Sequence, residues 1–363
     1  MIKFIHTGDV HIGVGSKHKN LYNRNKRRIE IMETFFKIID RCQNTDILLI
    51  AGDLFDDTYC TLSDIRMVVD KLKDIENTKV FIATGNHDPL VNNSLYDIVD
   101  WPPNVHIFSS TGITKVDLED KNLTVWGYSW SSGEEYRNLI EDMEIGKTND
   151  INILLIHGDI FDKNSKYMPL DKRGLKEKGF DYVALGHIHK HQFIEDNIAY
   201  CGSPEPLDFG ELGEHGIIEG TLGNKYSDFK FVPLSNRKYI IDEIKINGDI
   251  SYTDIIDKIL SCYEEESRMK NYFRIKLVGT RDRDLDLNGY DLNHILSEKF
   301  YYIEINDETF PDYDLDEMKK EYSGSIIDKY IRIMEKKGLE NPVVKDALYI
   351  GLEELLREKV ILK

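Results

Sequence analysis

Apolar and polar residues follow each other over residues 1–235 in blocks that predict strands and helices in turn. The short apolar blocks are continuous, which is typical of strands buried on both faces of a sheet. They cover residues 2–5, 47–51, 80–83, 151–156 and 182–185. Between them lie segments with helical spacing of apolar residues, and this order predicts a layered α/β domain.

The clearest predicted helix covers residues 27–42, where Ile31, Phe35 and Ile38 lie on one face. A second predicted helix covers residues 134–143. Short strands with glycine turns between residues 192 and 232 predict an antiparallel extension of the same domain.

The pattern changes at residues 233–238. Residues 239–305 alternate strand and helix as a small β-α-β-α-β module, and residues 306–316 carry many acids and Pro311, which indicates a linker. We therefore predict three parts. These are a main domain at 1–235, a small capping domain at 236–306, and an acidic linker with a helical segment at 307–363.

Two amphipathic helices are predicted after the linker, at about residues 315–337 and 341–359, separated by Gly338. The pattern leaves two interpretations open. The helices pack on their own domain, or they form a tethered element that docks on a partner. The predicted partner-binding residues are Ile327, Ile331, Leu348, Leu352 and Leu355.

Composition narrows the function classes. The chain has 363 residues and a net charge of −18, which argues against a protein that coats nucleic acid without sequence preference. Its four cysteines form no CxxC pair, and no apolar stretch reaches the length of a membrane span. We expect a reduced, cytoplasmic setting and no membrane partner.

Aspartate, asparagine or histidine residues follow each of the five apolar runs. They are Asp9, His11, Asp53, Asn86, His157, His187 and His189. The ends of parallel strands meet at one edge of a sheet, so these side chains are predicted to converge. Carboxylate, imidazole and amide groups bind divalent ions, and two ions need a bridging anion, for which Asp53 is the best candidate.

A two-metal site of this kind hydrolyses phosphoesters. His87 follows the ligand Asn86 and is predicted to act as a general acid. Asp88 is predicted to orient His87 through a hydrogen bond. Each motif alone is a common turn or surface pair, but their joint occurrence in this order favours a catalytic site.

A basic segment follows the first two ligands. Its residues are Lys17, Lys19, Arg24, Lys26, Arg27 and Arg28. We predict that they contact substrate phosphates beside the metals and, where the substrate is DNA, position it without reading its bases. The alternative is an exposed helix start, which is common.

These residues resemble a known signature. Asp9-x-His11, Gly52-Asp53, the segment Gly85-Asn86-His87-Asp88, His157 and Gly186-His187-x-His189 are similar to the motifs of calcineurin-like metallophosphoesterases. The segments 9–13, 52–56 and 202–211 resemble the branch that contains the SbcD-like nuclease subunits of DNA double-strand-break repair complexes. The module at 236–306 and the final helices are similar to that branch's capping domain and ATPase-docking segment.

The resemblance implies a manganese-dependent nuclease with single-strand endonuclease and 3′-to-5′ exonuclease activity. It also implies a homodimer that associates with DNA and with an SMC-like coiled-coil ATPase. Two Mn²⁺ ions per subunit are expected, with Mg²⁺ or another divalent ion as alternatives. Asp9, His11, Asp53 and His189 would hold one ion, and Asp53, Asn86, His157 and His187 the other.

The chain departs from that branch at Asp56, where many members have a histidine three residues after the bridging aspartate. A carboxylate there repels phosphate, which predicts weaker exonuclease activity. Two alternatives stay open. One is a general phosphodiesterase acting on nucleotides or small diesters, and the other is a mainly structural dimeric scaffold for an ATPase.

Overall fold

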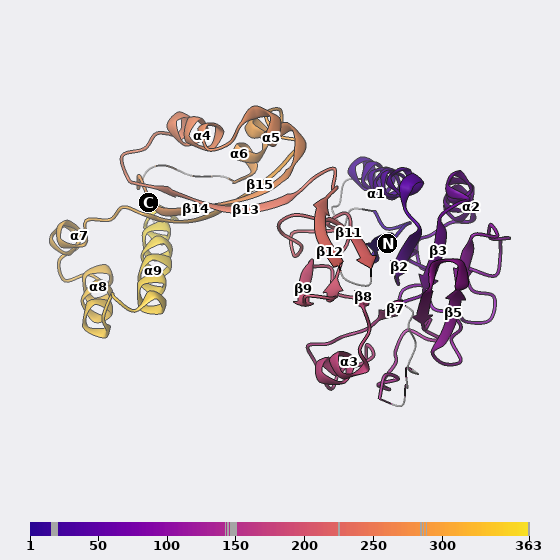
Figure 1. The fold of residues 1–363 in the computed structure, drawn as a ribbon. Coiled ribbons are helices and arrows are strands. Elements are labelled where there is room, and N and C mark those ends of the chain that lie inside the picture. The colour runs from indigo at the N-terminus through magenta and orange to yellow at the C-terminus, as the bar shows by residue number, and fades with distance from the viewer. Residues whose placement is uncertain are drawn as a thin grey trace. The chain divides into compact units, whose positions relative to one another are not determined.

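A computed structural model describes residues 1–15, 21–141, 143, 145, 151–223, 226–283, 285, 287 and 289–361. The chain divides into two compact units, Met1–Tyr239 and Ile240–Lys363 (Figure 1). In the described part of the chain, no helix combines the length and the apolar character needed to cross a membrane.

The first unit contains two six-stranded sheets. The order of the first sheet is β12-β11-β1-β2-β3-β4. Strands β1 to β4 are parallel, and β11 pairs antiparallel with β1. Their bounds are β1 Ile2–Thr7, β2 Ile47–Ala51, β3 Lys79–Ala83, β4 Val105–Ile107, β11 Gly216–Gly223 and β12 Tyr226–Pro233.

The second sheet has the order β5-β6-β7-β8-β10-β9, and its neighbours β6, β7, β8 and β10 are parallel. The bounds are β5 Thr114–Leu118, β6 Leu123–Gly127, β7 Ile151–His157, β8 Tyr182–Gly186, β9 Gln192–Glu195 and β10 Ile198–Tyr200. The five continuous apolar runs therefore form β1, β2, β3, β7 and β8, as predicted.

Strand alternation builds the layers. Ile47 and Leu49 point into a core shared by the two sheets, whereas Leu48 and Ile50 point into a core shared with helices α1 (Leu21–Arg41) and α2 (Leu62–Leu72). The outer face of the second sheet packs on α3 (Lys172–Lys178). The predicted layered α/β fold with an antiparallel extension is confirmed.

The predicted helix at 134–143 is wrong. Residues 134–141 form a loop that ends in a turn, and Glu135 makes a parallel bridge with Tyr167. The Glu135 amide donates to the Lys166 carbonyl at 2.9 Å, and the Met168 amide donates to the Glu135 carbonyl at 2.6 Å. These long-range bonds occupy backbone groups that a helix would use.

The second unit contains a three-stranded sheet of β13 (Tyr239–Ile246), β14 (Tyr272–Arg281) and β15 (Tyr302–Pro311). Helices α4 (Tyr252–Ser261), α5 (Glu265–Lys270) and α6 (Gly289–Leu296) accompany the sheet, and α4 and α6 contribute to its core. The predicted linker is wrong over residues 306–311, because these pair with β14 while the acids at 307 and 308 stay exposed. The division of the chain into three domains stays a prediction.

The described residues after this sheet form three helices where two were predicted. They are α7 (Leu315–Glu321), α8 (Ile326–Lys337) and α9 (Pro342–Ile361). The predicted first helix is interrupted at Gly324, where φ is +76°, and restarts after Ser325, whose side chain accepts from the Asp328 amide.

The predicted partner-binding residues form the core of this helical segment. Ile327, Ile331, Leu348 and Leu352 are buried against one another, and Leu355 packs partly buried beside them. Two amphipathic helices joined by a short loop bury their apolar faces against each other. The choice of these five side chains as partner-binding residues is therefore wrong, because they face the interior of the helical segment. Docking of the segment on a partner stays a prediction.

This packing makes Leu352 a stability residue. We expect Leu352→Ala to destabilise the helical segment by about 2–5 kcal/mol, because it leaves a cavity in a small core. The matched control Ile350→Ala removes a side chain that is 61% exposed on the same helix and is expected to change little. Limited proteolysis and hydrogen exchange of α7–α9 check this. Equal protection of the two variants would contradict it.

Candidate metal centre

The predicted ligands lie at or just after the carboxyl ends of strands in both sheets. Cross-strand hydrogen bonds fix these loops. The Asp9 amide donates to the Gly52 carbonyl at 3.0 Å, and the His11 amide donates to the Asp53 carbonyl at 2.9 Å. His157 Nδ1 lies 2.9 Å from the Ala51 carbonyl oxygen, and this contact joins the two sheets.

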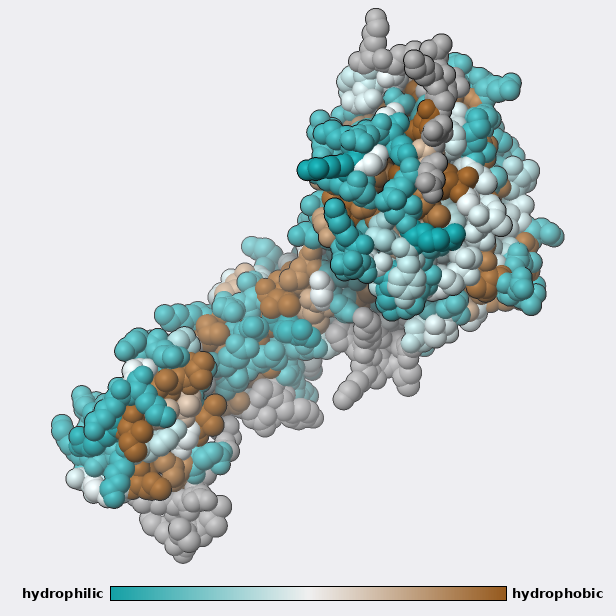
Figure 2. All heavy atoms as spheres, turned by 90° about the horizontal axis from the view of Figure 1, so that it is seen from below, coloured by the Kyte–Doolittle hydropathy of each residue, from teal (hydrophilic) through white to brown (hydrophobic). Residues whose placement is uncertain are grey.

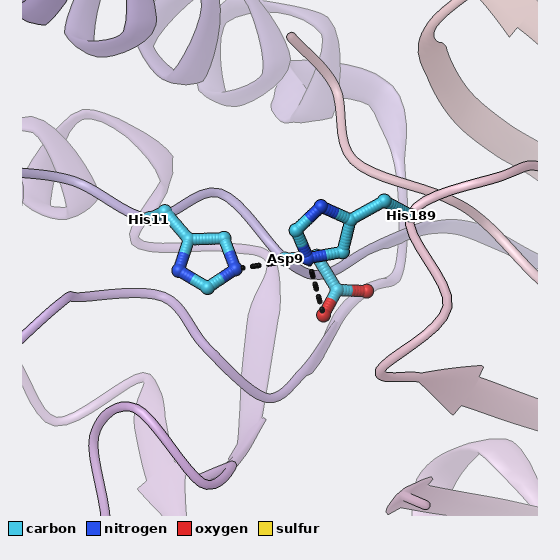
Figure 3. Close-up of side chains that lie close together, drawn as sticks. All are labelled: Asp9, His11 and His189. Carbon is cyan, nitrogen blue, oxygen red and sulfur yellow. Dashed lines mark hydrogen bonds and ion pairs between the residues drawn. The ribbon is translucent and has the colours of Figure 1, made fainter. Parts of the chain in front are cut away.

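One group of side chains consists of Asp9, His11 and His189, whose ligand atoms all lie within 4.8 Å of one another (Figure 3). The Nε2 atoms of His11 and His189 are 3.1 Å apart. Asp9 Oδ1 lies 3.9 Å from His189 Nε2. Three donor atoms from two segments that are far apart in the sequence thus point at one small volume.

A second group consists of Asp9, Asp53 and His157. His157 Nε2 lies 3.5 Å from Asp53 Oδ2 and 3.0 Å from Asn86 Oδ1. The His187 ring lies beside the His157 ring, with centroids 5.2 Å apart, and its backbone amide donates to both Asp9 oxygens at 3.0 Å. The structure therefore brings all seven predicted ligands to one place.

Asp53 lies between the groups. Its Oδ2 atom is 3.7 Å from His11 Nε2 and 3.5 Å from His157 Nε2. A third group, His11, Asp53 and His87, also contains it. This position supports the predicted role of Asp53 as a bridge.

Backbone strain concentrates at the same residues. Asp9, His11 and Asp53 have φ of 50°, 52° and 49°, and His187 has φ of 102°. Such conformations cost roughly 1–3 kcal/mol each and persist only where the surroundings enforce them. Gly52, with φ of 87°, precedes Asp53, and a Cβ atom there would meet the His157 ring.

The ionisable side chains of the centre have shifted pKa values that suit the binding of a cation. Burial raises the pKa of Asp9 to about 6 and raises the pKa of Asp53 well above its ordinary value. Burial also lowers the pKa of His11 and of His157, so both rings are neutral. Buried carboxylates beside neutral imidazoles, with no sulfur among the donors, fit divalent ions such as manganese.

His87 is oriented by Asp56 and not by Asp88, so that prediction is wrong. His87 Nδ1 lies 3.2 Å from Asp56 Oδ2, and the His87 side chain is 48% exposed. This hydrogen bond raises the pKa of His87 against the opposing effect of burial. Asp56, which was predicted to repel phosphate, is therefore the hydrogen-bond partner of the predicted general acid His87.

Asp88 instead organises the loop that carries Asp53. Its carboxylate is buried and accepts hydrogen bonds from the Asp53, Leu54 and Phe55 amides, at 3.2, 2.9 and 3.2 Å. It also accepts from the Gly85 amide at 2.7 Å and from the Tyr96 hydroxyl at 2.6 Å. A residue beside His87 in sequence therefore holds the backbone of the bridging aspartate.

We expect Asp88→Asn to lower the free energy of unfolding by about 2–4 kcal/mol, because an amide group cannot accept all of these bonds and leaves buried donors unpaired. Urea denaturation measures it. Asp100→Asn, at an exposed position, is the control and is expected to unfold like the wild type. If both variants unfold at the same urea concentration, Asp88 does not have this role.

The side chains of the predicted basic segment are not all exposed to solvent. Lys17, Lys19 and the side chain of Arg24 lie outside the described residues, and Lys26 is partly buried. Arg27 is 1% exposed and pairs with Glu30 at 3.1 Å and Glu205 at 2.7 Å, so its prediction as a DNA contact is wrong. Helical periodicity turns Arg27 towards the core, where two acids neutralise it. Arg28 pairs with Asp64 and stays partly exposed.

One residue of the centre was missed. Glu211 Oε1 lies 2.7 Å from His189 Nδ1, on the ring edge opposite the ligand atom. No local signal marks this contact in the sequence, because Glu211 follows no apolar run and is well separated from His189 along the chain. His191 belongs to none of the ligand groups and stacks on Phe231, with ring centroids 4.0 Å apart.

Comparisons with known proteins agree with this chemistry. A sequence profile of the calcineurin-like phosphoesterases matches residues 2–191. The chain is 27% identical over 252 residues to the uncharacterized metallophosphoesterase YhaO of Bacillus subtilis. The match covers 63% of this chain and 60% of that protein. It is 26% identical over 279 residues to the DNA double-strand break repair protein Mre11 of Methanocaldococcus jannaschii, covering 71% of this chain and 73% of the relative.

Proposed function

Because the chain belongs to the calcineurin-like phosphoesterase family, we propose that its metal centre cuts phosphodiester bonds in DNA with two manganese ions. The observation that carries this proposal is the convergence of seven proposed ligands, with Asp53 between the others and His87 partly exposed beside them. Similarity to a relative named as a DNA double-strand break repair protein supports DNA as the substrate. The match to the Bacillus relative spans 60% of that protein's length.

The ligands divide into two sets. Asp9, His11, Asp53 and His189 would hold one ion, and Asp53, Asn86, His157 and His187 would hold the other. Bound divalent ions neutralise phosphate charge and lower the pKa of water so that hydroxide is available near neutral pH.

His87 supplies the proton in this proposal. Its ring stays partly exposed, which leaves it accessible to the leaving oxygen, while Asp56 holds Nδ1 and leaves Nε2 free to donate. Asp56 is thus a positioning residue. Its buried carboxylate, 8% exposed, also adds negative charge near the substrate, and weak exonuclease activity beside normal endonuclease activity is the expected consequence.

The partners are proposed to be DNA, a second copy of the chain and an SMC-like ATPase. The buried stripe of the helical segment is not available to the ATPase, but a second set of apolar residues is. Ile326 and Ile333 lie two helical turns apart on α8, and Val343 and Ile350 have the same spacing on α9. They are 68%, 52%, 73% and 61% exposed. Figure 2 shows hydrophobic patches on the hydrophilic surface of the second unit. We propose these four as the docking residues.

The test is a nuclease assay with manganese and then magnesium on a single-stranded circle and on an end-labelled duplex. His87→Ala controls for contaminating nucleases, and His294→Ala, at an exposed histidine in the second unit, is the matched control. If the single-stranded circle is cut in manganese, and this cutting is lost in His87→Ala but not in His294→Ala, the result supports the proposed nuclease activity.

Two other outcomes separate the alternatives. Hydrolysis of a small phosphodiester without cleavage of DNA would favour a general phosphodiesterase. Neither activity, in protein that binds two metal ions, would favour the scaffold for an ATPase.

A further inference from the structure

His189 is held from behind by a carboxylate. Its Nε2 atom faces Asp9 and His11 (Figure 3), and its Nδ1 atom lies 2.7 Å from Glu211 Oε1. Glu211 lies in the loop between β10 and β11, and its side chain is 17% exposed.

Glu211 is itself fixed. Its second oxygen, Oε2, accepts from the Leu207 amide at 3.0 Å and from the Ser203 hydroxyl at 3.2 Å. The Ser203 amide donates to the His189 carbonyl at 3.0 Å, and its hydroxyl oxygen lies 2.9 Å from His215 Nδ1. The same loop therefore holds both the backbone and the ring of His189.

This arrangement determines which ring nitrogen is available as a ligand. A carboxylate accepts but does not donate, so a neutral His189 ring carries its one proton on Nδ1, between the ring and Glu211. The lone pair of Nε2 is then directed towards Asp9 and His11. A carboxylate in this place orients the ring and makes it a stronger ligand.

In the other half of the centre, the hydrogen-bond partner of His157 Nδ1 is not a carboxylate. His157 Nδ1 contacts the Ala51 carbonyl oxygen at 2.9 Å, which is a neutral acceptor. Among Asp53, Asn86, His157 and His187, the shared Asp53 is the one carboxylate. Asp9 Oδ1 lies 3.9 Å from His189 Nε2 and also 3.9 Å from His157 Nδ1, so the feature that distinguishes the set with His189 is Glu211 behind the ring. The attraction for a divalent cation is therefore unequal between the two halves.

We propose that Glu211 is a positioning residue for His189, and that it makes the set of Asp9, His11, Asp53 and His189 the tighter of two manganese sites, which fills first. This inference rests on the proposed two-metal centre. It adds an order of filling and a residue outside the ligand set that controls it.

The experiment is a titration of the metal-free full chain with Mn²⁺. Binding is measured by calorimetry and by the electron paramagnetic resonance signal of the Mn²⁺ that stays free. The wild type is expected to bind two ions in separate steps. Glu211→Gln keeps the shape and removes the charge, and it is expected to weaken the first step by roughly 10–100-fold while the second step changes much less. Glu214→Gln, at an exposed acid in the same loop, is the matched control.

Ser203→Ala gives a second route if Glu211→Gln does not fold, because it removes only one of the hydrogen bonds that fix Glu211. It is expected to weaken the first step by a smaller factor, in protein with unchanged circular dichroism. Two equal steps in the wild type, or equal weakening of both steps in the variants, would overturn the inference but leave the two-metal centre standing. Absence of any Mn²⁺ binding by the wild type would refute the proposed centre itself.

Discussion

Asp53→Asn is expected to abolish binding of both metal ions and to lower phosphodiesterase activity by at least about 10³-fold. Asp53 Oδ2 lies 3.7 Å from His11 Nε2 and 3.5 Å from His157 Nε2, so both halves of the centre depend on it. Asparagine has one neutral oxygen and cannot bridge two cations. Each bound ion contributes several kcal/mol to stabilising the transition state, and about 1.4 kcal/mol corresponds to a tenfold change in rate.

The same variant has a distinct effect on stability. Burial raises the pKa of Asp9 from 3.8 to about 6 and raises the pKa of Asp53 well above its ordinary value. These two carboxyl groups therefore bind more protons in the folded, metal-free protein than in the unfolded chain, and their contribution to stability falls as the pH rises above 4 towards 6 and beyond. Asp53→Asn removes one such buried charge, so we expect no loss of stability without metal.

Thermal unfolding with and without Mn²⁺ checks both expectations. The melting temperature of the wild type is expected to rise with Mn²⁺, and that of Asp53→Asn is expected to stay constant. Asp57→Asn, at an exposed acid in the same loop, is the control and is expected to behave like the wild type. A rise in the Asp53→Asn melting temperature equal to that of the wild type would mean that Asp53 is not the bridge.

The sequence was sufficient to predict the buried strands and the convergence of the proposed ligands for a physical reason. Continuous apolar runs mark strands buried on both faces. The parallel strands β1 and β2 of the first sheet end beside Asp9 and Asp53, and the parallel strands β7 and β8 of the second sheet end at His157 and beside His187. Strand direction and burial are local properties of the pattern, so convergence followed from them without knowledge of any distance.

The contacts beyond the strand ends could not be predicted in the same way. Asp88 is next to His87 in sequence, yet its carboxylate points to the amides of residues 53–55, and Asp56 is the residue that reaches the ring. Arg27 belongs to a basic run, but helical rotation places it against Glu205, which is distant in the sequence. Hydropathy patterns give the face of an element, whereas these pairings depend on how separate loops meet.

The helical segment illustrates the same limit. The sequence showed which helix faces are apolar. However, an apolar face that packs on a neighbouring helix has the same residue spacing as one that binds a partner protein. Only the pairing of α8 with α9 distinguishes them, and it assigns Ile331 and Leu352 to the interior.

Loss of His87 is expected to lower the rate of DNA cleavage by about 10²–10⁴-fold, since that is the usual contribution of a general acid. Loss of its partner, in Asp56→Asn, is expected to lower the rate by about 10-fold, because the ring stays present but is less well oriented and less readily protonated. The two residues act as a unit through one hydrogen bond of 3.2 Å. The double variant is therefore expected to be no slower than His87→Ala alone.

The pH profile distinguishes this role of Asp56 from a structural one. A general acid must be protonated, and the hydrogen bond to Asp56 raises the pKa of His87. Activity should therefore persist to higher pH in the wild type than in Asp56→Asn, whose basic limb moves to lower pH. The comparison uses kcat/KM on the single-stranded circle across the pH range, with Asp57→Asn as the control. An unshifted basic limb in Asp56→Asn, together with normal folding and metal binding, would show that Asp56 does not act through His87.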